Sequence, residues 1–72
     1  MSLKKRSFTL SGHRTSVALE AEFWAVIDAG AARERLSLAA LVAKIDASRG
    51  DRPLASALRL FALSAKGANS SP

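Results

Sequence analysis

The sequence contains no cysteine and a single histidine among its 72 residues. Without cysteine it cannot form a disulfide bond, and His13 alone supplies too few nitrogen and sulfur ligands for a zinc-type site. The covalent and metal supports that stabilise many small domains are therefore excluded. Because so short a chain buries only about 60% of its unfolded surface, we expect a second copy to add stability and predict a homodimer, with higher oligomers left open.

Long hydrophobic runs are also missing. The longest stretch without a charge covers residues 36–43, whereas a membrane-spanning helix needs about 20 apolar residues. The first basic residues are followed by Ser-Phe-Thr-Leu rather than by a sustained apolar region, so no signal peptide is expected. A basic amphipathic segment on an anionic membrane is a weaker alternative, since the basic residues do not line one helix. We therefore predict a cytoplasmic protein without a membrane partner.

Acidic residues are scarce. Six of them stand against eleven lysines and arginines, which gives a net charge of +5. Lys4, Lys5, Arg6 and Arg14 give residues 1–14 a charge of +4 with no acid, while seven bases and six acids leave only +1 on the rest. A basic N-terminal segment is typical of proteins that bind a polyanion such as DNA, and these residues are candidate phosphate contacts. The alternative is that the charge only keeps the protein soluble.

None of the arrangements that support catalysis is present. His13 has no second histidine or cysteine to pair with. The carboxylates are scattered without the paired spacing of an acid–base site, and no glycine-rich phosphate loop occurs. We predict that the chain is not an enzyme and holds no cofactor or metal.

Two short segments, residues 6–10 and 14–19, alternate between apolar and polar side chains. This period of two predicts a pair of β-strands, each with one face toward a core. The core faces are formed by Phe8 and Leu10 in the first segment and by Thr15, Val17 and Leu19 in the second; the opposite faces are formed by Ser7 and Thr9 and by Arg14, Ser16 and Ala18.

A two-residue turn at Gly12 and His13 is expected to join these strands into a hairpin, since a type II′ turn favours glycine at its first central position. This register sets Phe8 opposite Val17, so that the apolar faces match. The alternative is that residues 1–10 form a flexible basic arm, because chain termini are often disordered.

Three helical segments follow. The first is expected from about residue 20 or 21 to about residue 35. The second runs from residue 38 to about residue 47 after Ser37, a favourable N-cap, and the third covers about residues 53–65. Each has an apolar stripe at helical spacing: Phe23, Val26, Ile27 and Ala31; Leu38, Leu41, Val42 and Ile45; Leu54, Ala57, Leu58, Phe61 and Ala65.

Three further features concern the helices and the chain end. Gly30 weakens the first helix by up to about 1 kcal/mol unless it permits a close backbone approach, so we expect a tight helix crossing there. Leu60 and Leu63 lie off the stripe of the third helix, which indicates a second apolar face for a partner. Residues 67–72 are rich in Gly, Ser, Asn and Pro and are expected to be disordered.

The sequence resembles a known superfamily in three runs: Ser16-Val17-Ala18-Leu19-Glu20 at a strand end, Ala21-Glu22-Phe23-Trp24 at a helix start and Leu36-Ser37-Leu38-Ala39-Ala40-Leu41 at a second helix start. These are similar to the ribbon-helix-helix superfamily. More narrowly, Lys5-Arg6-Ser7 followed by Gly12-His13-Arg14-Thr15-Ser16-Val17 and Leu19-Glu20 resembles a short bacterial ribbon-helix-helix family of mostly uncharacterised proteins. Residues 5–63 carry the resemblance.

The resemblance implies a mainly α fold with a short β-ribbon, in which two chains interlock as a homodimer. Each chain lends residues 14–19 to a two-stranded antiparallel ribbon over a four-helix core, and the ribbon enters the DNA major groove. We place the domain, with an N-terminal strand or hairpin and an additional C-terminal helix, at residues 6–66, between a flexible basic segment at 1–5 and the tail. The implied dimer core is Val17, Leu19, Phe23, Trp24, Ile27, Leu38, Leu41 and Ile45.

The resemblance also implies a DNA-binding site. Arg14, Ser16 and Ala18 match positions that read base edges: arginine bonds guanine bidentately, serine bonds almost any base, and alanine contacts only a thymine methyl. The amides of Ser37, Leu38 and Ala39 match a phosphate clamp at the start of the second helix, and Lys4, Lys5 and Arg6 add phosphate contacts. An ordinary capped helix start is the alternative reading of Ser37.

One departure from the superfamily pattern is Arg35, which stands where relatives often have a helix-ending glycine and therefore needs a left-handed conformation at a costlier residue. We predict a homodimeric small transcriptional regulator that binds double-stranded DNA. The alternative is a dimeric protein–protein interaction module or antitoxin-like adaptor that holds a protein partner through the C-terminal helix, as Leu60 and Leu63 indicate.

Overall fold

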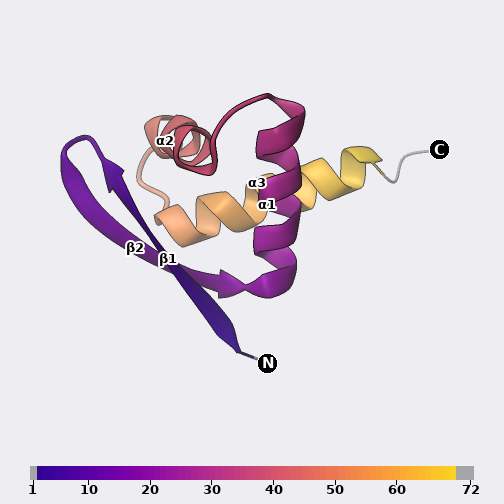
Figure 1. The fold of residues 1–72 in the computed structure, drawn as a ribbon, viewed down its shortest axis with the longest axis horizontal. Helices are drawn as coiled ribbons and strands as arrows, with labels where there is room; N and C mark the ends of the chain where they lie inside the picture. The colour runs from indigo at the N-terminus through magenta and orange to yellow at the C-terminus, as the bar shows by residue number, and fades with distance from the viewer. Residues whose placement is uncertain (1, 70–72) are drawn as a thin grey trace.

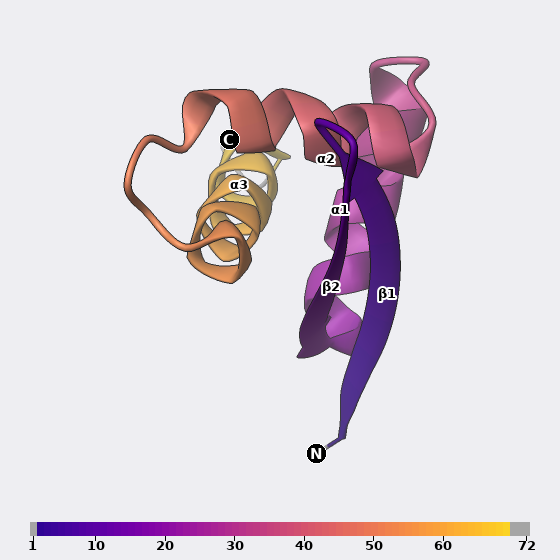
Figure 2. The ribbon, with the colours of Figure 1, turned by 90° about the vertical axis from the view of Figure 1, so that its left-hand side faces the viewer.

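The computed structural model describes residues 2–69 and the side chains of residues 2–65. Two strands precede three helices: β1 (Leu3–Leu10), β2 (His13–Glu20), α1 (Ala21–Arg33), α2 (Leu38–Ser48) and α3 (Leu54–Asn69). The twisted hairpin of β1 and β2 runs beside α1, and α3 crosses α1 (Figure 1). Figure 2 shows α2 lying across one end of the molecule, near the hairpin turn. The predicted mainly α fold with a short β-ribbon and an additional C-terminal helix is confirmed.

The hairpin turn consists of Ser11 and Gly12, and Leu10 pairs with His13. The φ angles of the two turn residues are 52° and 79°. Positive φ at both central positions defines a type I′ turn, whose twist matches the right-handed twist of the strands. The predicted turn at Gly12 and His13 is therefore wrong. The sequence indicates the correct turn position only weakly, because the first turn residue is a serine, whereas type I′ turns favour asparagine there.

The strand register consequently differs from the predicted one by two residues. Phe8 pairs with Thr15 rather than with Val17. Side chains alternate between the faces of a strand, so a shift by an even number leaves each side chain on its predicted face. Phe8 and Val17 are both buried, with 7% and 5% of their surface exposed. The hydrophobic pattern fixed the faces but could not distinguish the two registers.

The hairpin also begins earlier than predicted. Residues 3–5, expected to be a flexible basic segment, belong to β1 and pair with the second half of β2. The indole Nε1 of Trp24 donates a hydrogen bond to the carbonyl oxygen of Lys4 at 2.7 Å. The interpretation of residues 1–10 as a flexible arm is therefore wrong for the part that the structure describes, because strand pairing and Trp24 hold it against α1.

α1 ends in a Schellman motif. The amide of Leu36 donates to the carbonyl of Ala31 at 2.9 Å, and the amide of Arg35 donates to the carbonyl of Ala32 at 3.1 Å. Arg35 has a φ of 58°, the left-handed conformation in which this motif usually has glycine. The predicted left-handed turn at Arg35 is confirmed, and α1 ends at Arg33, slightly before the predicted boundary.

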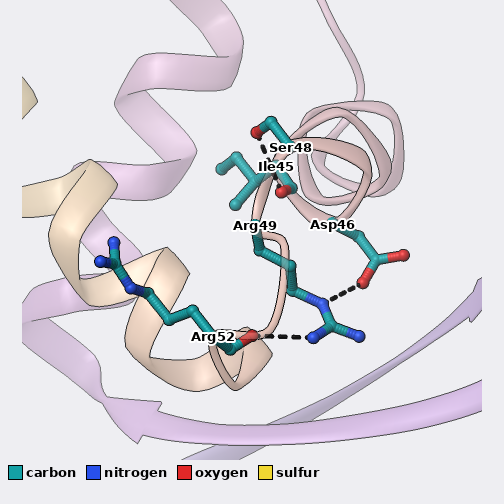
Figure 3. Close-up of polar contacts among 5 residues, drawn as sticks. All are labelled: Ile45, Asp46, Ser48, Arg49 and Arg52. Carbon is teal, nitrogen blue, oxygen red and sulfur yellow. Dashed lines mark hydrogen bonds and ion pairs between the residues drawn. The ribbon is translucent and has the colours of Figure 1, made fainter.

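α2 begins with a side-chain cap and ends in an arginine-held loop. Ser37 Oγ accepts a hydrogen bond from the amide of Ala40 at 3.0 Å, which confirms the predicted N-cap. At the other end, Arg49 Nε donates to Asp46 Oδ1 at 2.6 Å and its Nη1 donates to the carbonyl of Arg52 at 2.7 Å (Figure 3). Arg49 therefore fastens the connection between α2 and α3.

α3 extends from Leu54 to Asn69. Residues 67–69, predicted to belong to a disordered tail, are thus helical, and residues 70–72 lie outside the described part of the chain. None of the helices of the described residues is long and apolar enough to cross a bilayer.

α1 and α3 cross closely at Gly30. A Cβ atom on Gly30 would lie 2.9 Å from both Cε2 and Cζ of Phe61, closer than real Cβ contacts. The predicted tight crossing is confirmed, and its partner is the aromatic ring of α3. The surrounding core combines residues of the hairpin and all three helices: Phe8, Leu10, Val17, Leu19, Trp24, Ile27, Ala31, Leu41, Val42, Ile45, Ala57, Leu58 and Ala62.

Candidate nucleic-acid interface

The face of the hairpin turned away from the helices contains the three residues that were predicted to read bases. Arg14 and Ser16 are exposed, and Ala18 is half-buried. Between them, Val17 is buried and Thr15 is half-buried against the core. This alternation follows from the period of two along β2 and leaves the candidate base-reading side chains accessible to a ligand.

β1 adds a second row to the same face. The register places Thr9 beside Arg14, Ser7 beside Ser16, and Lys5 beside Ala18. All three β1 residues are exposed. We call the six residues the outer face: Lys5, Ser7 and Thr9 of β1, and Arg14, Ser16 and Ala18 of β2. The sequence already put Ser7 and Thr9 on the polar face of their strand, but they were not included among the predicted site residues.

The hydroxyl groups at the centre of the outer face contact each other. Ser7 Oγ and Ser16 Oγ are 2.9 Å apart, and either hydroxyl can be the donor. This bond connects the two strands across their exposed surface, where opposite hydroxyl pairs contribute modestly to pairing. The outer face is therefore a continuous polar strip with a basic side chain on each strand.

None of the six outer-face residues is acidic, and Glu20 is the next residue of β2 with the same strand parity. The nearest acid along β2 is Glu20, and the guanidinium Nη2 of Arg59 lies 3.3 Å from its Oε1. The hydrogen bond from its own backbone amide, together with the hydrogen bond and charge of Arg59, lowers the pKa of Glu20 despite partial desolvation. This carboxylate stays ionised at neutral pH, but its charge is balanced by α3 rather than by Lys5 or Arg14.

The three basic residues near the N-terminus do not act as one cluster. Lys5 belongs to the outer face, whereas Lys4 and Arg6 have the opposite strand parity. Arg6 Nη1 lies 3.0 Å from Asp28 Oδ1, and its guanidinium carbon lies 4.8 Å from the ring centroid of Trp24. Of the predicted phosphate contacts, Lys5 is thus placed beside the candidate base-reading row, while Arg6 already has a carboxylate and an aromatic partner.

An open hollow of about 400 Å³ lies between the base of the hairpin and α1. Its lining includes the buried Trp24, two alanines of α1 and the ion pair of Arg6 and Asp28. The hollow is lined by Lys4, Lys5, Arg6, Ala21, Trp24, Ala25 and Asp28. Asp28 neutralises one of its three basic residues, so the hollow keeps the same net positive charge as the outer face, with Lys5 belonging to both.

The start of α2 offers two unpaired amides. Ser37 Oγ binds the amide of Ala40, and Leu41 donates to the carbonyl of Ser37 at 3.0 Å. The amides of Leu38 and Ala39 belong to the first turn and have no intrahelical acceptor. The predicted cap and the predicted phosphate clamp are therefore compatible, since the cap uses a different amide. α2 packs against β1, which brings this helix close to the hairpin.

The residues predicted to form the dimer core are mostly buried within one chain. Of the eight, only Phe23 and Leu38 remain half-buried; Val17, Leu19, Trp24, Ile27, Leu41 and Ile45 each expose 9% or less. The strand expected to pair with a second chain has β1 of its own chain along one edge. α3 packs against α1, α2 and β2 and contributes Ala57, Leu58 and Ala62 to the core. Within the described residues, no group of three or more acidic, histidine or cysteine side chains is arranged to hold a metal ion.

Comparison with protein-family models gives one assignment. A family described as a ribbon-helix-helix domain matches residues 3–65, which includes both strands and most of α3. Comparisons with curated proteins and with solved structures found no match.

Proposed function

Because the chain belongs to the ribbon-helix-helix domain family, whose members are generally DNA-binding transcription regulators or antitoxins, we propose that it is a small transcriptional regulator that binds duplex DNA. The outer face of its hairpin enters the major groove, which admits a two-stranded β-ribbon. The amides of Leu38 and Ala39 at the start of α2 hold a backbone phosphate and fix the orientation. The bacterial cytoplasm is the proposed location.

The observation that carries this proposal is the chemistry of the outer face. Its side chains are basic, hydroxyl-bearing or small, its two basic residues stand on different strands, and it has no acid. Arg14 is the residue expected to discriminate most, through a bidentate bond to guanine, and Lys5 supplies charge at the other end.

We further propose that the functional unit is a homodimer. The residues first expected at the interface are buried in the single chain, but Leu60 and Leu63 on α3 remain 45% and 57% exposed. Leu63 borders a hollow of about 160 Å³ that is also lined by Glu22, Phe23, Val26 and Ala62. Pairing through this surface covers the exposed leucines and leaves both hairpins accessible, so that each can occupy one half-site.

A salt series tests the DNA-binding proposal. Binding of the full chain to a random-sequence duplex is measured by fluorescence anisotropy between 50 and 200 mM salt, conditions chosen on the scale of known phosphate-dependent binding. Each phosphate contact contributes about one unit to the slope of log affinity against log salt. Arg14→Ala is expected to weaken binding and reduce the slope by up to about one unit. Arg52→Ala, which removes an equal charge from an exposed loop residue, is the matched control.

The second candidate function is an adaptor or antitoxin-like module whose α3 surface holds another protein. The exposure of Leu60 and Leu63 favours it as much as it favours a dimer. If micromolar protein shows no salt-dependent DNA binding, the regulator proposal is wrong and the adaptor remains. Light scattering of the native chain and of Leu63→Ser then distinguishes the uses of α3: a dimer that dissociates on substitution shows self-association, whereas a native monomer leaves the surface for a different partner.

A further inference from the structure

The open hollow between the base of the hairpin and α1 shares only Lys5 with the outer face. We call it the basic hollow, and its lining comes from β1 and α1: Lys4, Lys5, Arg6, Ala21, Trp24, Ala25 and Asp28. Its volume of about 400 Å³ lies within the range of about 300–1,000 Å³ that is typical of small-ligand sites. Such sites combine apolar surface with a few polar groups, and the basic hollow has both.

We infer that the basic hollow is a binding site for a small organic anion, that is, a carboxylate or phosphate ester on a compact apolar body. Lys4 and Arg6 bind the anionic group, and the apolar body lies on the surface of α1 at Ala21 and Ala25. The inference goes beyond the proposed function, because it concerns a ligand that the chain binds whether or not it also binds DNA.

The charge of the basic hollow favours an anion. Its three basic side chains and one carboxylate give three positive charges and one negative charge, which leaves a net charge of +2. Lys4 and Lys5 are both exposed, so their ammonium groups are free to turn toward a ligand. Clefts lined by one sign of charge concentrate ligands of the opposite sign. An anion is therefore preferred over a neutral molecule of the same shape.

Arg6 is already held in place before a ligand arrives. Its Nη1 donates to Asp28 Oδ1 at 3.0 Å, and its guanidinium carbon lies 4.8 Å from the ring centroid of Trp24. The bond to Asp28 uses one of the five N–H donors of a guanidinium, which binds carboxylate and phosphate groups in a bidentate manner. Because the side chain is held on two sides, less freedom is lost when an anion binds.

The surface of α1 sets the size and polarity of the rest of the ligand. Ala21 and Ala25 are four residues apart, so they lie on the same side of the helix, and both are exposed. Their methyl side chains let an apolar body approach the helix closely. A volume of about 400 Å³ equals that of about 13 water molecules at about 30 Å³ each. A ligand with one ring fits this space, whereas a nucleotide, with a base, a sugar and a phosphate, exceeds it.

NMR titration of the full chain tests the inference. The probes are benzoate and phenyl phosphate, and the signals followed are the backbone amides and the indole N–H of Trp24. Benzyl alcohol carries a ring without a charge, and inorganic phosphate carries a charge without a ring. We expect both probes to shift the signals of Lys4, Arg6, Trp24 and Ala25 saturably. Their affinity should exceed that of either comparison ligand by about tenfold or more.

Two substitutions act on different parts of the site. Lys4→Gln removes an exposed charge but keeps the carbonyl that accepts from Trp24, and it should weaken binding about threefold to fivefold. Ala25→Leu fills the apolar part without changing the charge, and it should weaken binding by more than about tenfold. Arg52→Gln and Ala43→Leu are the matched controls at exposed positions outside the basic hollow, and both should keep the native affinity.

The outcomes separate a built site from other kinds of binding. Far-UV circular dichroism checks that each variant is folded, and Ala21→Leu replaces Ala25→Leu if the latter is not. The inference is wrong if millimolar probe gives no saturable shift, or if both substitutions leave the affinity unchanged. It is also wrong if inorganic phosphate binds as tightly as phenyl phosphate, or if a DNA duplex shifts these signals and the probes do not. The proposed function is judged separately, by the salt series.

Discussion

Gly30→Ala tests whether the contact between α1 and α3 is as tight as the structure indicates. In an open helix, replacing glycine by alanine stabilises by about 1 kcal/mol. Here the new methyl group would lie 2.9 Å from two ring atoms of Phe61, with Leu41 Cδ2 at 3.9 Å. Phe61 is half-buried against the core, so its ring has limited room to move. Overpacking of this kind costs about 1–3 kcal/mol, and we expect Gly30→Ala to lower the free energy of unfolding by about 1 kcal/mol.

A double-mutant cycle isolates the steric part of this effect. Phe61→Leu shortens the opposing side chain and is itself destabilising. In that background, Gly30→Ala should no longer clash and should raise the free energy of unfolding by about 0.5–1 kcal/mol through helix propensity. The sign of the alanine effect thus reverses between the two backgrounds. Urea denaturation followed by far-UV circular dichroism measures all four proteins. Equal stabilisation by alanine in both backgrounds would refute the tight crossing.

Three further changes test the local interactions. Arg35→Gly should raise the free energy of unfolding by about 0.5–1 kcal/mol, because it relieves the left-handed strain at the end of α1; urea midpoints check this, and Arg35→Ala, which keeps the strain, should show no comparable gain. Trp24→Phe should lower the free energy of unfolding by about 2 kcal/mol, since the change removes ring volume and leaves the carbonyl of Lys4 without its indole donor. A thermal midpoint equal to that of the native chain would contradict this. Glu20 has a lowered pKa, so its stabilising contribution is present above the ordinary glutamate range and is lost as the pH falls below about 4. Glu20→Gln should therefore reduce the fall of the urea midpoint below about pH 4. If the midpoint falls as steeply in the variant as in the native chain, the ion pair of Glu20 and Arg59 does not contribute to stability.

Features that depend on neighbours in the chain could be predicted from the sequence. The N-cap at Ser37 and the alternation along β2 follow from local backbone and side-chain preferences, whereas the left-handed residue at Arg35 was predicted from the resemblance to a family that often has glycine there. The helix crossing at Gly30 could be predicted as well, because a glycine inside a helical stripe has a cost that close packing explains. The identity of its partner, Phe61, could not, since it depends on how α3 returns across α1.

The hairpin register and the roles of the basic residues needed the structure. Two registers that differ by two residues bury the same side chains. The hydrophobic pattern therefore cannot show whether Thr15 or Val17 is the partner of Phe8. Likewise, the sequence treats Lys5 and Arg6 as equal positive charges. Because the two residues have opposite strand parity, Lys5 lies on the outer face and Arg6 forms an ion pair with α1. Predicting this difference requires knowing which elements pack on each side of the hairpin.

The fluorescence of Trp24 can report on the contact between the hairpin and α1. It is the only tryptophan in the chain, it is 2% exposed, and its indole contacts β1 through both the carbonyl of Lys4 and the guanidinium of Arg6. Any motion that lifts the base of the hairpin from α1 admits water to the indole and shifts its emission to longer wavelength. Detachment of the hairpin can therefore be recorded in the native sequence, without a dye and separately from the loss of helix.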